Sequence, residues 1–284
     1  EIYRCDWSSD VCSSDLQVDL VVNVTEKPTG NLTLGAGYSQ TEKISLIAGI
    51  QQENLFGSGN SLGLNVNTSR FNRQIVVSTT DPYFTPDGVS RTIDVYHRTT
   101  RPLTVQAGDY KLVTTGGAVR FGVPFTETDT VYFGAGAEQT RIEAGNGMPQ
   151  AYKTYMDDFG SAPVSVPLTV GWGRDTRDSA LVPTRGRLQR LNGELGALGD
   201  TRYAKANYQF QQYIPLNKKF TLAFNAEAGW GEGLSGKPYP LFKNFYGGGL
   251  GSVRGFEQGT LGDRSDIVGS TTGQKANIGG TRKM

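Results

Sequence analysis

The stretch FTLAFNAEAGW, residues 220–230, decides the fold class of this chain. Apolar side chains occupy every second position from Phe220, and residues such as Thr221, Asn225 and Glu227 stand between them. Because a β-strand sends successive side chains to opposite faces, this alternation predicts a strand with one apolar and one polar face. A strand of a soluble sandwich has roughly 5–6 residues, whereas a strand that crosses a bilayer needs ~10. The stretch therefore predicts a membrane-spanning strand.

The same alternation recurs along the chain, and each run closes on Gly, Asn, Asp or Pro. We predict eleven strands, near residues 31–39, 43–53, 60–71, 73–81, 88–99, 110–123, 129–143, 163–174, 185–197, 202–213 and 219–231. The long connections, at 100–109, 144–162 and after Gly231, all follow odd-numbered strands. Outer-membrane barrels have short periplasmic turns and long outer loops, so we expect the first strand to begin at the periplasm. The predicted fold class is all-β, an antiparallel transmembrane β-barrel.

Composition narrows the choice of partners. The 284 residues have a mean hydropathy of −0.38 and a formal net charge of +1. No stretch approaches the ~20 apolar residues of a membrane helix, but alternating strands keep mean hydropathy low while every other residue is apolar. The sequence has no evident basic patch and no strong net charge, so no nucleic-acid partner is expected.

Residues 1–16 differ from everything that follows. They contain Cys5 and Cys12, whose spacing fits no zinc pattern, and they lack the basic start and apolar core of a signal peptide. Their amino-acid sequence resembles the translation of a sequencing adapter. We interpret this segment as non-native and exclude it, which removes all cysteine chemistry.

Catalytic groups are not evident in the sequence. His97 stands on a predicted strand, no serine lies in a nucleophile-elbow pattern, and the glycines at 247–251 lack the Lys-Ser/Thr of a phosphate-binding loop. Four aspartates have the spacing of turn residues and not of cation ligands, namely Asp175, Asp178, Asp263 and Asp266. We predict that the protein is not an enzyme and uses no cofactor or metal.

The segment GGGLGSVRGF at 247–256 is not explained by alternating strands. Its glycines surround one arginine, whose guanidinium carries five donors and a permanent charge. The run Val253, Arg254, Gly255, Phe256 resembles the V-R-G-F/Y signature in the long loop of the BamA family of outer-membrane-protein assembly barrels. Further resemblance to this family lies in NLTLGAGY at 31–38, QENLFGSG at 52–59, TDPYF at 80–84 and DTRD at 175–178.

The resemblance implies how the chain is divided. Residues 17–30 would be the end of the last POTRA domain and its linker. Residues 31–284 would be the first two-thirds of a sixteen-stranded barrel, about 11–12 strands, with the V-R-G-F loop at 232–280. Such a fragment cannot close, and its expected location is the bacterial outer membrane.

The resemblance also implies two sites. Arg254 would fold back into the lumen and pair with carboxylates beyond Met284. The alternative is that Arg254 is an exposed loop arginine, which the same sequence would also fit. The first strand would form a lateral seam with the last barrel strand, through Asn31, Leu32, Thr33, Leu34, Gly35, Ala36, Gly37 and Tyr38. Gly35 and Gly37 either weaken packing at this edge or simply relieve crowding.

The function that the resemblance implies is the insertion and folding of other outer-membrane proteins. An openable strand edge would template the incoming strand by β-augmentation. The implied partners are the lipid bilayer, nascent outer-membrane proteins, periplasmic chaperones and the lipoproteins of the assembly machine. A two-partner-secretion or translocation exporter shares the loop and is distinguished by its number of POTRA domains. A simple porin or receptor barrel would need neither the loop nor a weak seam.

Overall fold

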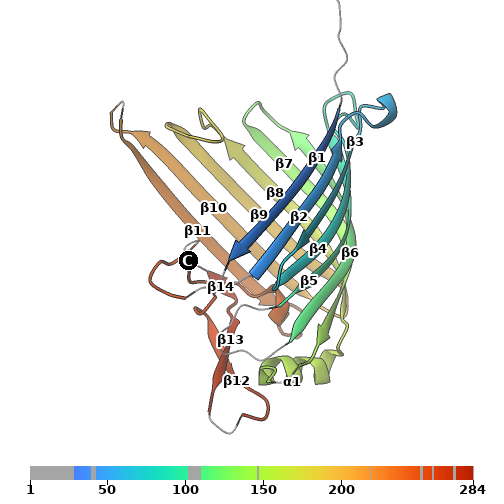
Figure 1. Cartoon of the computed structure of the whole chain (residues 1–284), viewed down its shortest axis with the longest axis vertical. Helices are drawn as coiled ribbons and strands as arrows, with labels where there is room; N and C mark the ends of the chain where they lie inside the picture. Colours follow the sequence, from blue (N-terminus) through green and yellow to red (C-terminus); the bar gives the residue numbers. More distant parts are fainter. Residues whose placement is uncertain are drawn as a thin grey trace, which may run out of the picture.

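The computed structural model describes residues 29–39, 43–101, 110–145, 147–217, 219–249, 252–257, 259–270 and 273–283. The segment predicted to be non-native, 1–16, and most of the predicted linker at 17–30 lie outside these residues. Long tilted strands form one curved wall, and shorter elements gather at one end of it (Figure 1).

The wall is a single antiparallel sheet in the order β1 to β11 followed by β14. Its strands are β1 (Gly30–Ser39), β2 (Lys43–Gln52), β3 (Ser61–Thr68), β4 (Asn72–Asp81), β5 (Ser90–Thr100), β6 (Lys111–Pro124), β7 (Asp129–Glu143), β8 (Val164–Asp175), β9 (Gly186–Gly199), β10 (Tyr203–Pro215), β11 (Thr221–Gly233) and β14 (Arg282–Lys283). Each of the eleven predicted strands is present within a few residues of its predicted limits. β1 and β14 are the two ends of the described sheet, so the wall is an incomplete barrel, as predicted.

Strand register separates an outer from an inner face. Residues directly opposite each other project to the same side, and Trp172 pairs with Leu191, which in turn pairs with Tyr208. Along β11, Leu222 and Phe224 follow the same rule and are 52% and 58% exposed. The outer face is therefore an apolar band. The intervening positions face the lumen and include charged side chains in the middle of strands, such as Asp94, Glu138 and Glu194, whereas the charged side chains of the outer face lie toward the strand ends.

The longest connections of the described wall lie at one of its ends, although that end also has short ones at 69–71 and 200–202. One end, the turn end, carries short connections such as 53–60, 82–89 and 125–128. The other end, the loop end, carries 144–163 and the long segment between β11 and β14, which we call the lumen loop. This is the asymmetry that the sequence predicted.

The connection 144–163 contains a helix that the sequence analysis did not predict, α1 (Gln150–Phe159). Tyr152, Tyr155, Met156 and Phe159 recur at the spacing of one helical face, and they pack on Tyr110 and on residues of the lumen loop. The most buried apolar cluster thus lies at the loop end, where α1 and the lumen loop pack on the ends of β6 and β7. Within the described ranges, no helix is long and apolar enough to cross a membrane.

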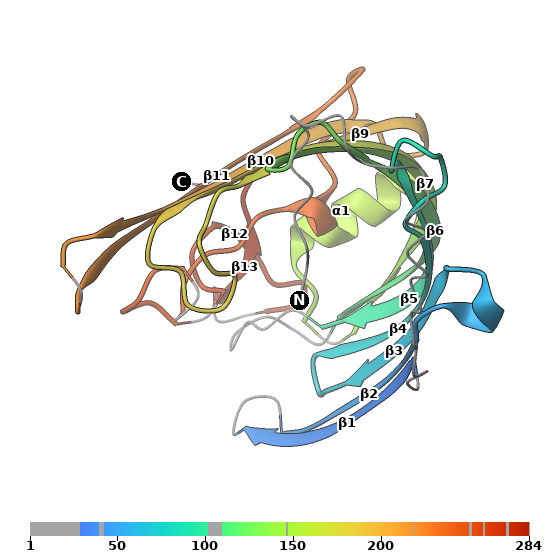
Figure 2. The same cartoon turned by 90° about the horizontal axis from the view of Figure 1, so that it is seen from above.

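The lumen loop is itself structured. It contains the short helix η2 (Leu241–Lys243) and a hairpin of β12 (Asp263–Asp266) and β13 (Lys275–Gly279). The hairpin meets α1, where the backbone N–H of Ala151 donates to Ser265 Oγ at 3.0 Å. Viewed along the wall, these elements lie within its curve (Figure 2). The lumen loop therefore lies against the inner face of the later strands.

Candidate functional site

The lumen loop turns back onto the wall directly after β11. Leu234 N–H donates to Arg202 O at 2.9 Å, and Lys237 Nζ donates to Asp200 O at 2.5 Å. A non-glycine residue with positive φ, Ser235 at 56°, makes the reversal. The chain then enters η2 already pressed against β9 and β10.

A buried ionic cluster fixes η2 to the inner wall. Lys243 Nζ lies 2.6 Å from Glu138 Oε1 of β7 and 2.7 Å from Glu194 Oε1 of β9. The three side chains are 17%, 8% and 25% exposed, respectively. We call these three residues the Lys243 cluster. It joins one loop residue to two strands that are not neighbours in the sheet.

Hydroxyl groups complete the hydrogen bonding of the two carboxylates. Tyr96 OH donates to Glu138 Oε2 at 2.9 Å and Ser165 Oγ donates to Glu138 Oε1 at 3.3 Å. Tyr203 OH donates to Glu194. A buried ion pair is favourable only when its remaining lone pairs are satisfied in this way. The cluster meets that condition.

The charge of Lys243 is stabilised by its surroundings. Burial alone would lower the pKa of Lys243, but the opposite charges of Glu194 and Glu138 and their hydrogen bonds outweigh burial and raise it. The lysine is thus protonated throughout the neutral range. Lys205 Nζ donates to Lys243 O at 2.9 Å, so the backbone of η2 is held as well.

Two aromatic rings of the loop occupy space that glycines of β11 leave open. A Cβ at Gly231 would lie 2.5 Å from Tyr239 Cζ, and a Cβ at Gly229 would lie 2.8 Å from the ring of Phe245. Any larger residue at either position would displace the ring. Glycine is therefore required here for close approach between the wall and the loop.

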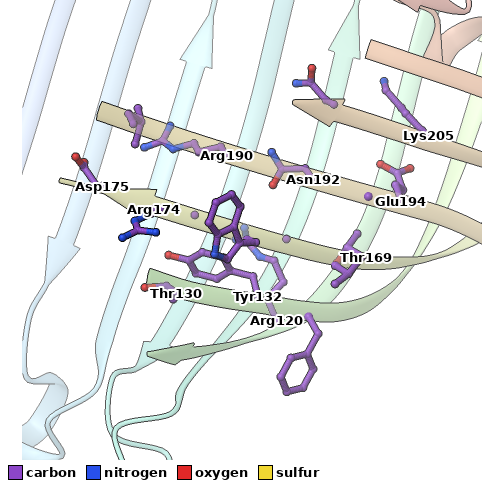
Figure 3. A pocket seen from close by; sticks show the side chains of 18 of the residues that line it. Arg120, Thr130, Tyr132, Thr169, Arg174, Asp175, Arg190, Asn192, Glu194 and Lys205 are labelled. Atoms are coloured by element: carbon purple, nitrogen blue, oxygen red, sulfur yellow. The ribbon is translucent and has the colours of Figure 1, made fainter. Parts of the chain in front are cut away.

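A cavity of about 680 Å³ lies beside the cluster and is lined mainly by residues of β6–β10. Figure 3 shows Glu194 and Lys205 at one end of it and Arg174 and Asp175 at the other. Arg120 also lines it, and its Nη2 lies 2.5 Å from Asp94 Oδ2. Charges of both signs along the wall make this interior hydrophilic.

The V-R-G-F run lies further along the lumen loop, on an exposed turn. Gly249 N–H donates to Phe256 O at 2.9 Å, and Gly255 has a φ of 93° that favours glycine. Val253 is 43% and Phe256 is 53% exposed. Arg254 is exposed too and forms no ion pair with a described residue. The implied pairing of Arg254 with later-strand carboxylates stays a prediction.

The eight residues of the predicted seam all lie on β1. One edge of β1 pairs with β2, from Asn31 opposite Gln51 to Tyr38 opposite Ile44. On its other edge, the described sheet offers no partner. Leu34 is 72% exposed on the outer face, and Gly35 and Gly37 face inward. The structure therefore puts the predicted seam residues at the free edge of the wall.

The remaining polar residues that the sequence singled out are apart from one another. His97 faces outward, with Nδ1 2.8 Å from Thr115 Oγ1. Asp175 pairs with Arg177 at 2.8 Å, and Asp178 accepts from the backbone N–H of Thr184 at 2.9 Å, as residues of a turn do. In the part of the chain that the structure describes, no three His, Cys, Asp or Glu side chains gather as metal ligands would.

Comparison with known proteins agrees with this architecture. A family model described as the Omp85 superfamily domain matches residues 54–284. The chain belongs to the Omp85 superfamily. Because the described wall is an antiparallel sheet with an apolar outer face, this Omp85 chain is part of a bacterial outer-membrane β-barrel.

Several Omp85 relatives carry names that refer to assembly. The outer membrane protein assembly factor BamA of Neisseria meningitidis serogroup B is 40% identical over 279 residues, which cover 94% of this chain and 35% of that protein. BamA of Nitratidesulfovibrio vulgaris is 30% identical over 260 residues, covering 90% and 32%. The crystal structure of BamA from Haemophilus ducreyi lacking POTRA domains 1–3 matches with a TM-score of 0.81 at 27% identity, over 90% of this chain and 52% of that one. The chain thus spans about a third of the length of these two BamA relatives.

Sequence reasoning did not identify the Lys243 cluster in this Omp85 chain. Glu138 and Glu194 stand at inner-face positions of strands, where a charge is unremarkable in a barrel. The available signal was Lys243 itself, the one charged residue within the mainly apolar and aromatic run YPLFKNFY at 239–246. A charge in such a run needs a partner when the run is buried.

Proposed function

We propose that the intact protein inserts and folds other outer-membrane proteins, and that the free edge of β1 is the working element. The relatives named BamA support the general role. The observation that supports the mechanism is the position of β1, which is an edge strand of the described sheet and pairs with β2 along ten residues on its other side.

An open strand edge is a row of unpaired N–H and C=O groups that can accept another strand. In this mechanism an incoming strand pairs with β1 by main-chain hydrogen bonds, which need no particular side-chain sequence. That property suits a factor with many clients. The nascent outer-membrane protein and the surrounding bilayer are then the partners. The implied lipoproteins and periplasmic chaperones stay predictions.

The lumen loop supports the same mechanism from the opposite half of the wall. The Lys243 cluster and the ring contacts at Gly229 and Gly231 attach the loop to β7, β9 and β11. These strands are far from β1 in the sheet order. The attachment therefore braces one half of the wall and leaves the edge strand to separate.

A reversible cross-link tests the proposed edge. Gly35 is a suitable site, because a Cβ there meets Ile47 Cβ at an ordinary 3.9 Å. In the intact protein, we expect a disulfide between Gly35→Cys and a cysteine facing it on the last strand to abolish client insertion, and we expect reductant to restore it. The matched control joins Ala48→Cys to Val66→Cys, which pair within the wall. Full insertion by the oxidised seam variant would contradict the edge mechanism, and secretion of clients instead of insertion would favour an exporter.

A further inference from the structure

A strongly basic groove lies at the loop end of β4–β7. It has a volume of about 360 Å³, and five cationic side chains line it, Arg70, Arg73, Arg101, Lys111 and Arg141. These residues are scattered along the sequence, which is why the sequence shows no basic patch. Folding brings them together.

The groove faces the bilayer and not the lumen. Arg73 pairs with Thr99, Thr99 with Val113 and Val113 with Arg141, so the two arginines project to one side. Val95 is four residues before Thr99 in β5, so its side chain projects to the same face. It is 58% exposed in the apolar outer face. The groove therefore belongs to the lipid-facing surface.

The groove also lies at the border of the apolar band. Thr99 is roughly 13 Å along β5 from Val95, at about 3.3 Å per residue. Beyond Thr99, the next outer positions are Arg101 and the pair Lys111 and Glu143. This border is where lipid headgroups meet the protein in a barrel of this kind.

The charge of the groove is mostly uncompensated. Its single carboxylate, Glu143, pairs with Lys111 at 2.7 Å. The four arginines form no ion pair with a described residue. By contrast, Arg120 in the lumen pairs with Asp94 at 2.5 Å, and Arg91 at the turn end lies 3.7 Å from Asp81. The groove thus brings four arginines without an ion pair in the described ranges together at headgroup level.

We propose that this groove binds the phosphates of an anionic lipid in the leaflet at the loop end. A guanidinium group can donate two parallel hydrogen bonds to the oxygens of one phosphate. Basic side chains at a membrane surface also attract anionic lipids. Arg73 and Arg141 are three strand spacings apart, about 14 Å at ~4.8 Å per strand. Because each extended arginine side chain covers about half of that separation, both can reach one phosphate that lies between them. A headgroup with two phosphates gives each arginine a phosphate of its own, so we expect the groove to bind such a lipid more tightly.

Lipid binding to the intact protein in nanodiscs tests the proposal. The probes are lipid A with two phosphates, phosphatidylglycerol with one, and neutral phosphatidylcholine. We expect tighter binding in that order. The double variant Arg73→Gln, Arg141→Gln should weaken lipid A binding by roughly a hundredfold, since each lost charge-assisted hydrogen bond corresponds to about tenfold. Arg73→Lys, Arg141→Lys should retain part of the affinity.

The control is Arg91→Gln, an arginine of β5 on the same outer face but at the turn end. It should bind lipid A like the wild type. Heat-modifiable gel mobility establishes that each variant is folded. Equal affinity of the glutamine double variant and the wild type would overturn the proposal. Displacement of lipid A by millimolar inorganic phosphate would also overturn it, in favour of a free-anion site.

Discussion

Lys243 of the lumen loop and Glu138 of β7 form an ion pair with Nζ and Oε1 2.6 Å apart, and this pair ties the loop to the wall. The V-R-G-F run is in the same loop, but its arginine is exposed and forms no ion pair within the described ranges. Two cations in one loop thus have different surroundings, and they lead to different predictions.

Neutralising Lys243 should release the loop. Lys243→Gln in the intact protein leaves Glu138 and Glu194 buried without a counter-charge, at a cost of roughly 3–5 kcal/mol in the free energy of unfolding. Urea titration of folded barrel in detergent measures it. The triple variant Lys243→Gln, Glu138→Gln, Glu194→Gln should recover much of the loss, because no uncompensated charge remains. Lys237→Gln, at an exposed contact, is the control, and a loss as large as that of Lys243→Gln would argue against the cluster.

A larger residue at the glycines of β11 that contact the aromatic rings of the lumen loop should destabilise the attachment of that loop and leave the strands intact. Gly231→Ala puts a Cβ where the ring of Tyr239 lies, and overpacking of this kind costs about 1–3 kcal/mol. We expect faster protease cleavage within the lumen loop, while the strands stay folded. Gly63→Ala is the matched control, because its Cβ meets its nearest neighbour at 3.8 Å. The idea fails if both variants are cleaved at the same rate.

The two faces of β11 should respond differently to charge. Leu222→Arg or Phe224→Arg exposes a cation to lipid and should cost about 2–4 kcal/mol if these side chains meet the bilayer midplane. Asn225→Arg points the other way and should be much milder. Folding titrations into lipid vesicles compare the three, and similar effects would show that the face assignment is wrong.

Arg254 is the subject of a separate prediction. If carboxylates of later strands hold it in the intact protein, Arg254→Ala should reduce barrel stability and client assembly together. Arg254→Lys should rescue only in part, because an ammonium lacks the planar fork of donors. In the present chain, where Arg254 is exposed, the alanine variant should unfold like the wild type. Normal assembly by the full-length alanine variant would identify Arg254 as an ordinary surface arginine.

The strands were predictable because apolar and polar residues alternate along a strand that has one face toward lipid and one toward water. The stretch at 220–230 lies in a single strand from Thr221 onward for this reason. Helix α1 was missed although Tyr152, Tyr155, Met156 and Phe159 carry its period, since a long outer loop was assigned there from length alone. A test of helical periodicity within each loop would have found it.

The charged sites were less accessible to sequence reasoning. Lys243, Glu138 and Glu194 come together only because the loop folds back across β9 and β7. The arginines of the outer groove come together only because β4–β7 are in a particular register. Pairing of charges between distant segments depends on the register of the strands and on the course of the loop. No short sequence pattern indicates either of them. The V-R-G-F motif lies in the same loop as Lys243.

The attachment of the lumen loop has a mechanical consequence for the wall. The sheet behaves as a cantilever, clamped by the loop over β7–β11 and free at β1. A lateral load on the free edge bends such a plate most strongly just outside the clamp. Gly116 and Gly117 of β6 lie at that line, opposite Glu138 and Ala137 of β7, and have no side chains that would resist curvature. The deflection that separates β1 is therefore expected to hinge at β6, five strands away from the edge that moves.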